Sequence, residues 1–191
     1  MLRMGRFEIA DQTRLRLLEY RDAAELHALI ETNRPYLARW LPWAAAQTPA
    51  DSEEFIARTR TQLAANDGFQ VVVVSAGEIA GVVGFHGVDW DNRRTSIGYW
   101  LSEDHQGHGT ATAAVRLLAE HALAVWGLER VEIRAAVDNR RSRAIPERLG
   151  FREEATMRKV ECVGDRHLDC VVYSMVPADG VTRKGMGCTT T

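Results

Sequence analysis

The chain has little of what marks nucleic-acid-binding or disulfide-stabilised proteins. Its 24 lysines and arginines are balanced by 26 aspartates and glutamates, which gives a net charge of -2 at pH 7. This balance provides no basic field, so we do not expect a nucleic-acid partner. There are only three cysteines, Cys162, Cys170 and Cys188, and their spacing is unlike that of metal ligands. We therefore expect reduced thiols, no disulfide framework and no zinc site.

No apolar segment approaches the length of a membrane span. Apolar segments such as residues 71–74 are only a few residues long, whereas a transmembrane helix needs about 20 residues. Residues 1–10 also have no apolar core of the kind found in secretory signals. These absences favour a soluble, cytoplasmic protein without a membrane partner.

What the chain does contain is the composition of a globular protein. Its residues are 46% hydrophobic and 26% charged, a composition that suits one compact core. A length of 191 residues is too short for two ordinary domains. We expect one domain over residues 1–177. Residues 178–191 have few groups to bury, so we expect a flexible C-terminal tail there.

Hydrophobic periodicity predicts a chain of mixed strands and helices. Alternating or β-rich segments predict strands at residues 14–18, 69–75, 79–88, 95–101, 130–137 and 169–176. Helical spacing with start and stop signals predicts helices at residues 23–31, 49–66, 111–126 and 143–149. We place the start of the last helix at Arg143, because a helix that began at Arg140 would have to bend at Pro146.

The most informative segment lies between a predicted strand and a predicted helix. It reads Gln106-Gly107-His108-Gly109-Thr110-Ala111. Two glycines one residue apart let the backbone pass close to a ligand, and the first amides of the following helix have no acceptor within the helix. The helix dipole favours an anion there by about 0.3–1 kcal/mol per charge. Taken alone, the segment fits a tight connection as well as it fits a phosphate-binding loop.

Two familiar phosphate-binding motifs do not fit this segment. A P-loop has lysine followed by serine or threonine at the helix start, but here Gly109 is followed by Thr110 and Ala111. A dinucleotide-binding loop follows the first strand of a parallel unit and carries glycine or alanine at its sixth position. This chain has Thr112 there, after strands that we expect to be antiparallel.

A wider set of segments resembles the GNAT superfamily of acyl-CoA N-acyltransferases. The segments are Tyr99-Trp100-Leu101, the loop at 106–111, Asn139-Arg140-Arg141-Ser142 and Leu149-Gly150-Phe151. Residues 33–37, 40–43 and 142–146 are similar to the RimJ/RimL branch of that superfamily. The resemblance spans residues 15–176 and implies an α/β (α+β) GNAT fold, in which a mixed, mostly antiparallel central sheet is splayed at its middle and flanked by helices.

The resemblance also implies acetyl-CoA as co-substrate and no metal. In this family the loop amides hold the pyrophosphate, and pantetheine lies in a gap between the strands that end at Leu101 and near Val137. The cofactor-binding residues that it implies are Leu101, Gln106, Gly107, His108, Gly109, Thr110, Ala111, Asn139 and Ser142.

A primary amine is then expected to attack the thioester directly, with help from an acid and a base. Many family members place a tyrosine four residues before the glycine of Leu-Gly-Phe, where this chain has Pro146. In the RimL-like branch, a serine matching Ser142 is thought to protonate the thiolate and a glutamate matching Glu161 to act as base. Glu103 is a second candidate base. Two alternatives stay open: Ser142 as a helix cap, and Glu161 as a solvated strand residue.

The acceptor implied by the resemblance is a protein N-terminal α-amine, as in the acetylation of ribosomal proteins. Such an amine has a pKa of about 7.7–8.0, so a modest base is enough near pH 7. Asn33, Arg34, Trp40 and Trp43 are the candidates for binding it. A small-molecule amine and a non-catalytic acyl-CoA-binding module are the alternatives. RimL-like proteins often pair, so a homodimer is also an expectation.

Overall fold

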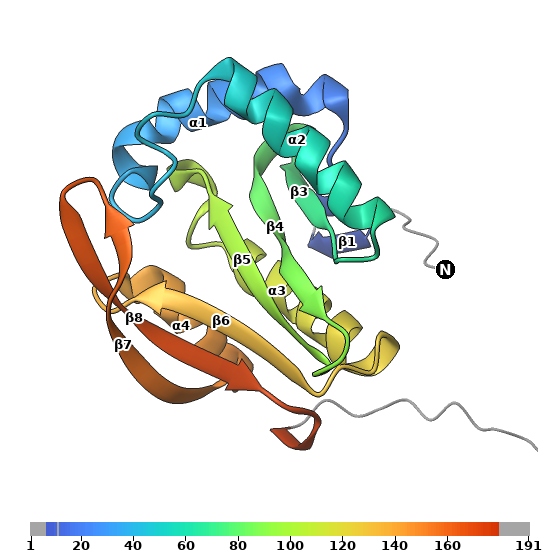
Figure 1. Cartoon of the computed structure of the whole chain (residues 1–191). Coiled ribbons are helices and arrows are strands. Elements are labelled where there is room, and N and C mark those ends of the chain that lie inside the picture. Colours follow the sequence, from blue (N-terminus) through green and yellow to red (C-terminus); the bar gives the residue numbers. More distant parts are fainter. Residues whose placement is uncertain (1–6, 11, 180–191) are drawn as a thin grey trace, which may run out of the picture.

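The computed structural model describes residues 7–10 and 12–179, and its centre is an eight-stranded sheet in the order β1-β2-β3-β4-β5-β6-β8-β7 (Figure 1). The strands are β1 (Phe7–Ala10), β2 (Thr13–Leu17), β3 (Gln70–Ser75), β4 (Glu78–Asp89), β5 (Arg94–Leu101), β6 (Arg130–Ala136), β7 (Arg152–Val163) and β8 (Arg166–Met175). Neighbouring strands are antiparallel except for β5 and β6, which are parallel. Most of the tail expected from residue 178 lies outside the described residues.

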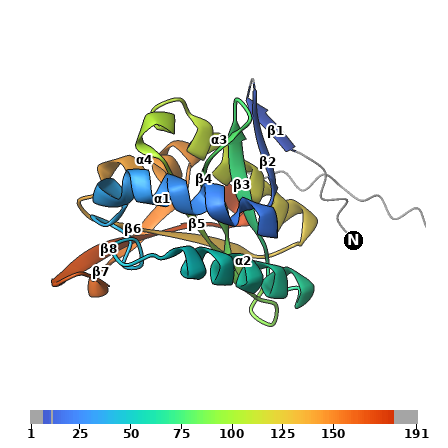
Figure 2. The same ribbon diagram turned by 90° about the horizontal axis from the view of Figure 1, so that it is seen from above.

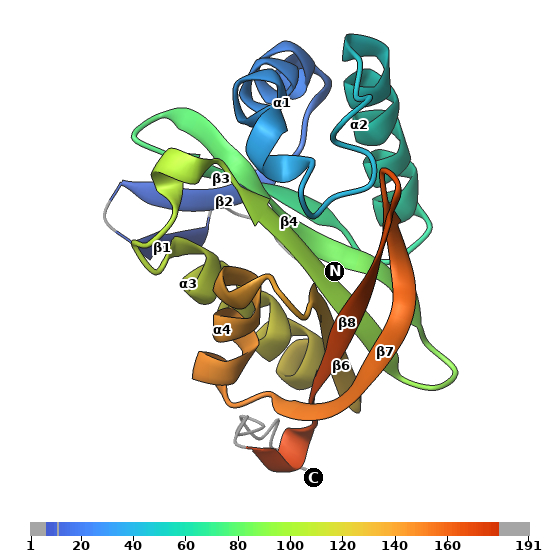
Figure 3. The same ribbon diagram turned by 90° about the vertical axis from the view of Figure 1, so that its left-hand side faces the viewer.

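Helices cover both faces of this sheet. They are α1 (Ala23–Leu37), α2 (Pro49–Ala64), α3 (Thr110–Glu120) and α4 (Arg140–Leu149). Figures 2 and 3 show α1 and α2 on one face and α3 and α4 on the other, and each face has its own cluster of buried apolar side chains. The predicted mixed, mostly antiparallel sheet flanked by helices is confirmed. None of the helices in the described ranges is long and apolar enough to cross a membrane.

The starts of the helices follow local signals in the sequence. At α2 the Thr48 hydroxyl accepts the Asp51 amide at 3.2 Å, and the Asp51 carboxylate accepts the Thr48 amide at 2.8 Å. This reciprocal cap, with Pro49 at the first helical position, satisfies amides that the helix itself leaves unbonded. At α3 the apolar stripe faces the sheet and buries Ala114, Val115, Leu118 and Ala119.

The sheet opens between β5 and β6. These strands pair only over three residues each, from Arg94 to Ser96 and from Arg130 to Glu132. Beyond this point β5 stays paired with β4 as far as Leu101, and β6 stays paired with β8 as far as Ala136. Each strand therefore keeps one neighbour and leaves its other edge free, so the expected splay at the middle of the sheet is confirmed.

Two strands were not expected from the sequence. Strand β1 is only four residues long, and β7 is polar or exposed along nearly all of its length. At the sheet edge, β7 has neither a buried face nor an apolar alternation, and this alternation is the signal on which strand prediction depends. Its ladder with β8 is interrupted between Glu153 and Ala155 and again between Met157 and Glu161.

An ionic cluster ties three strands together at the closed end of the opening. Arg130 of β6 donates to both carboxylate oxygens of Glu154 on β7, at 3.0 and 2.5 Å, and Ser174 of β8 donates to Glu154 at 2.7 Å. The bonds from Arg130 and then from Ser174 lower the pKa of Glu154 to about 2. The cluster therefore holds β6, β8 and β7 as one unit at physiological pH.

We expect Glu154→Gln to destabilise the protein at neutral pH and to have progressively less effect in acid. The glutamate pKa is about 2 in the folded chain against an ordinary value of 4.5. Its contribution to stability is thus fully present above about pH 4.5 and is lost as the pH falls toward about 2. Urea unfolding midpoints of the two proteins, measured downward from about pH 7, should converge below about pH 4.5.

The matched control for this prediction is Glu54→Gln. Glu54 pairs with Arg58 on the surface of α2, and both side chains are about two-thirds exposed, at 64% and 66%. Exposed pairs of this kind contribute little. If Glu154→Gln shifted the midpoint at neutral pH no more than Glu54→Gln, the Arg130–Glu154 cluster would have no stabilising role.

Candidate active site

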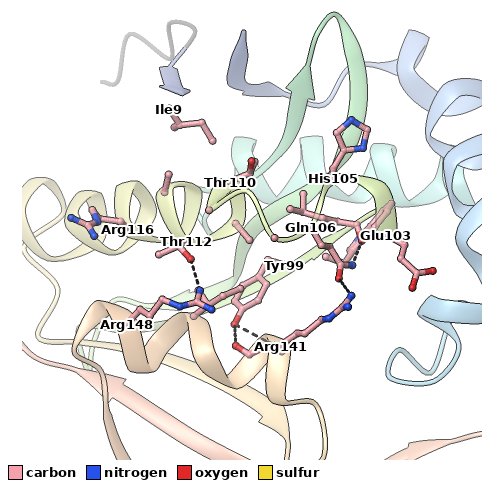
Figure 4. A pocket seen from close by; sticks show the side chains of 18 of the residues that line it. Ile9, Tyr99, Glu103, His105, Gln106, Thr110, Thr112, Arg116, Arg141 and Arg148 are labelled. Atoms are coloured by element: carbon pink, nitrogen blue, oxygen red, sulfur yellow. Dashed lines mark hydrogen bonds between the residues drawn. The ribbon is translucent and has the colours of Figure 1, made fainter. Parts of the chain in front are cut away.

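A cleft of about 910 Å³ lies at the open end of β5. Its walls come from the end of β5, the loop before α3, one side of α3 and of α4, the end of α1 and strand β1 (Figure 4). Nine of the residues predicted to bind cofactor or acceptor line it: Leu101, Gln106, Gly107, Gly109, Thr110, Ala111, Asn139, Ser142 and Trp40. Of the four segments that carried the superfamily resemblance, those at residues 99–101, 106–111 and 139–142 thus meet around one cavity, and Leu149-Gly150-Phe151 does not line it.

The loop before α3 presents a row of unbonded amides. Gly107 and Gly109 have φ angles of +84° and +78°, in the left-handed region that glycine adopts without strain. The first amide of this turn that bonds back to the helix is that of Ala113, which donates to the Gly109 carbonyl at 2.9 Å. Within residues 7–10 and 12–179, no acceptor meets the amides of residues 107–112. Their number and the helix dipole behind them suit the oxygens of a phosphate group.

Gln106 joins three walls of the cleft. Its side-chain amide donates to the Leu101 carbonyl at 3.0 Å. Its side-chain carbonyl accepts from the Tyr36 hydroxyl at 3.1 Å and from Arg141 Nη1 at 3.0 Å. Figure 4 shows Gln106 and Arg141 meeting in this way between the loop and α4. These contacts tie the ends of α1 and β5 to the start of α4, next to the free amides.

The start of α4 corrects two of the sequence-based interpretations. The helix begins at Arg140, not at Arg143, and its cap is Asn139, whose side-chain oxygen accepts the Ser142 amide at 3.1 Å. Ser142 therefore lies inside the first turn and is not the cap. Pro146 is accommodated within the helix even though its nitrogen has no hydrogen to donate to the Ser142 carbonyl. The Ser142 carbonyl instead accepts a hydrogen bond from a side chain of β5.

That side chain is Tyr99. Its hydroxyl donates to the Ser142 carbonyl at 2.9 Å, and the Ser142 hydroxyl donates to the Tyr99 oxygen at 3.3 Å. Burial raises the pKa of Tyr99 well above its ordinary value, although the bond with Ser142 opposes this. Tyr99 and Ser142 both line the cleft. In the sequence Tyr99 stands only as part of the Tyr99-Trp100-Leu101 segment, and nothing local indicates a role for its side chain.

Glu161 lies elsewhere, on β7 opposite Leu168. It is half-buried and does not line the cleft. Burial and then Arg134 lower the pKa of His86 on β4. Glu161 is near enough to oppose this shift in part. Burial and then Glu161 raise the pKa of the Cys170 thiol on β8. Glu161 thus lies near polar and charged side chains of β4, β6 and β8 and not among the residues that line the cleft.

Of the four acceptor candidates, Trp40 alone lines the cleft. Trp43 packs against Trp100, which does line it, with ring centroids 6.0 Å apart. Asn33 accepts the Glu103 amide at 2.8 Å and so holds the segment that follows β5. Arg34 donates to the carbonyls of Ala44 and Gln47.

Arg34 and His108, which were predicted to bind acceptor and cofactor, do not line the cleft. Arg34 also pairs with Glu31, so its guanidinium is engaged in fixing the loop between α1 and α2 that carries both tryptophans. His108 is exposed within the phosphate-binding candidate loop and does not line the cleft. Among the described residues there is no group of three or more His, Cys, Asp or Glu side chains that could hold a metal ion.

Comparison with known proteins gives consistent matches. Residues 12–152 match the family model described as the acetyltransferase (GNAT) domain. The chain is 38% identical over 171 residues to YdaF of Bacillus subtilis (strain 168), a candidate ribosomal N-acetyltransferase, with 88% of this chain and 93% of the relative covered. It is 25% identical over 170 residues to the ribosomal-protein-serine acetyltransferase of Escherichia coli (strain K12), with 88% and 95% covered.

A solved structure agrees with these matches in fold and sequence. It is that of the microcin C7 self-immunity acetyltransferase MccE, in complex with acetyl-CoA and AMP. The TM-score is 0.84 at 29% identity, and the match covers 92% of this chain and 97% of the other.

Proposed function

The chain belongs to the GNAT acetyltransferase family, and from this premise we propose that it transfers an acetyl group from acetyl-CoA directly to the N-terminal α-amine of a protein, with a ribosomal protein as the first candidate. The observation that carries the proposal is the row of unbonded amides at residues 107–112, which faces the cleft where β5 and β6 part. A reaction on ribosomal proteins would take place in the cytoplasm.

The residues of the cleft fit coenzyme A along its length. The amides of residues 107–112 are free to bind its pyrophosphate. The Leu101 carbonyl and the free edge of β5 offer hydrogen-bond groups to the amides of the pantetheine arm, and Asn139 and Ser142 face the same space. When bound, acetyl-CoA supplies an acyl group that is already activated as a thioester, so the protein has only to orient it and to manage protons.

We assign these proton transfers to Ser142 and Glu161. The Ser142 hydroxyl lies on the cleft wall and is not used as a helix cap. Its donation to the Tyr99 oxygen, at 3.3 Å, is long and would be exchanged for donation to the departing thiolate, after which water returns a proton to the serine oxygen. For the amine we keep Glu161 as base on the strength of the family resemblance, although it does not line the cleft, and Glu103, which lines the cleft, is the alternative. A base of modest strength is sufficient because an α-amine is already partly neutral near pH 7.

The names of relatives and the ligands in a relative's solved structure point to two substrate classes. The two curated relatives described above are named for ribosomal proteins, whereas MccE was solved in complex with acetyl-CoA and AMP. The second candidate function is therefore acetylation of an amine on a small molecule, such as an aminoacyl nucleotide. We give preference to the protein N-terminus because the relative that is named as a ribosomal N-acetyltransferase shares 38% of its residues with this chain.

The purified protein is expected to release thiol from acetyl-CoA in the presence of peptides with a free α-amine. At pH 7 the neutral fraction of an α-amine exceeds that of a lysine side chain by roughly a few hundredfold, so a lysine peptide with a blocked terminus should react far more slowly. Thiol release, together with mass spectrometry of the product, measures both. The same peptides with acetylated termini are the control.

A panel of polyamines, aminoacyl nucleotides and amine antibiotics tests the second function in parallel. Turnover of one of these compounds, with every N-terminal peptide inactive, would overturn the protein acceptor while leaving the acetyl-transfer chemistry intact.

A further inference from the structure

A proline inside α4 lies one helical turn after the proposed acid. In an α-helix the amide of residue 146 would donate to the carbonyl of residue 142, but a proline nitrogen carries no hydrogen. Pro146 is buried and Ser142 is partly buried, so the Ser142 carbonyl is at least partly withdrawn from water. An unsatisfied buried carbonyl is costly and calls for another donor.

Tyr99 provides that donor from a different element. Its hydroxyl reaches from β5 to the Ser142 carbonyl at 2.9 Å, and the same oxygen accepts the Ser142 hydroxyl at 3.3 Å. One phenol therefore holds both the backbone and the side chain of Ser142. Because the phenol proton is committed to the carbonyl, its oxygen can only accept from the serine, and this restricts the serine to a rotamer along the cleft wall.

We propose that Tyr99 is a positioning residue for Ser142, and that Pro146 makes this possible by leaving the Ser142 carbonyl without its helical partner. The inference rests on the proposed role of Ser142 as acid. Tyr99 does not exchange a proton with the thiolate itself; it holds the serine hydroxyl where that hydroxyl can turn to the sulfur. The raised pKa of Tyr99 is consistent with a phenol that remains protonated throughout.

The structural half of the inference is tested on the free protein by unfolding. Tyr99→Phe should lower the folded-to-unfolded ratio by about five- to tenfold, because it leaves the Ser142 carbonyl unbonded. In a Pro146→Ala background the restored helical amide satisfies that carbonyl, so the same Tyr99→Phe change should have less than half of this effect on the urea midpoint. Equal effects in both backgrounds would overturn the link to Pro146.

The functional half is tested by combining Tyr99→Phe with Ser142→Ala. Tyr99→Phe alone should lower kcat about tenfold and leave the KM for acetyl-CoA within about twofold. Added to Ser142→Ala, it should have no further effect on kcat, because a residue that acts through Ser142 has nothing left to position. A full tenfold loss on top of Ser142→Ala would overturn the inference.

The two halves keep this inference separate from the proposed function. If Ser142→Ala leaves kcat unchanged, the acid assignment has failed and so has positioning, while the unfolding measurements still decide whether Tyr99 serves the carbonyl. Tyr20→Phe is the matched control, since Tyr20 is 63% exposed and precedes the start of α1, whereas it is the other end of this helix that lines the cleft. It should change neither unfolding nor kcat.

Discussion

The Gly109→Val variant is expected to lose its affinity for coenzyme A, with a Kd raised about hundredfold or more. Gly109 caps α3 with a φ angle of +78°, and a β-branched side chain is strongly disfavoured in that region. To relieve the strain, the peptide planes on either side of residue 109 have to rotate. The rotation displaces the amides next to residue 109, and these belong to the stretch 107–112 that we propose for the pyrophosphate.

Isothermal titration with coenzyme A measures this loss directly, without a need for turnover. Gly77→Val is the matched control, because Gly77 also has a positive φ, +97°, and open space around the position of a Cβ atom. It lies in the turn between β3 and β4, away from the cleft, so it shares the strain but not the ligand. Unchanged binding by Gly109→Val would falsify the phosphate-loop assignment.

The second large effect is expected for Ser142→Ala, which should lower kcat by about a hundredfold with little change in the affinity for coenzyme A. General acid catalysis is commonly worth about 10²- to 10⁴-fold, and the alanine retains the backbone amide that Asn139 caps. Steady-state kinetics with the best peptide acceptor, together with titration of coenzyme A, separate the two quantities. A loss of affinity with kcat unchanged would make Ser142 a binding residue.

The pH dependence distinguishes this acid from the proposed base. Glu161→Gln should also lower kcat, but its deficit should shrink as the pH rises toward the amine pKa of about 8, where the amine no longer needs a base. The deficit of Ser142→Ala should not shrink in that range, because the thiolate still has to be protonated. If Glu161→Gln behaves as the wild type does at every pH, Glu103→Gln is the next variant to measure.

Several elements could be predicted because their signals are local. The start of α2 was readable from Thr48, Pro49 and Asp51, since a capping box is formed by residues within one turn. The loop before α3 could be predicted for the same reason, because its two glycines adopt positive φ angles. Strands β3 to β5 were readable because their apolar side chains are buried and their links are short.

Other features depend on partners that are distant in the sequence. Strand β7 forms through its ladder with β8, not through any apolar alternation of its own. The start of α4 at Arg140 could not be deduced from Pro146, because the donor that compensates for the proline is Tyr99, 43 residues before Ser142. Arg34, a candidate for binding the acceptor, is occupied by the loop carbonyls of Ala44 and Gln47.

The residues of this chain were enough to specify the family, the chemistry of the cleft loop and the order of the main strands and helices, because caps, glycine conformations and apolar periodicity act over a few residues. Folding in three dimensions was needed to establish which side chains share the cleft. Contacts such as Tyr99 with Ser142 and Gln106 with Arg141 join different elements. Their geometry depends on how β5 parts from β6 and how α4 packs beside it, and no short stretch of sequence encodes that.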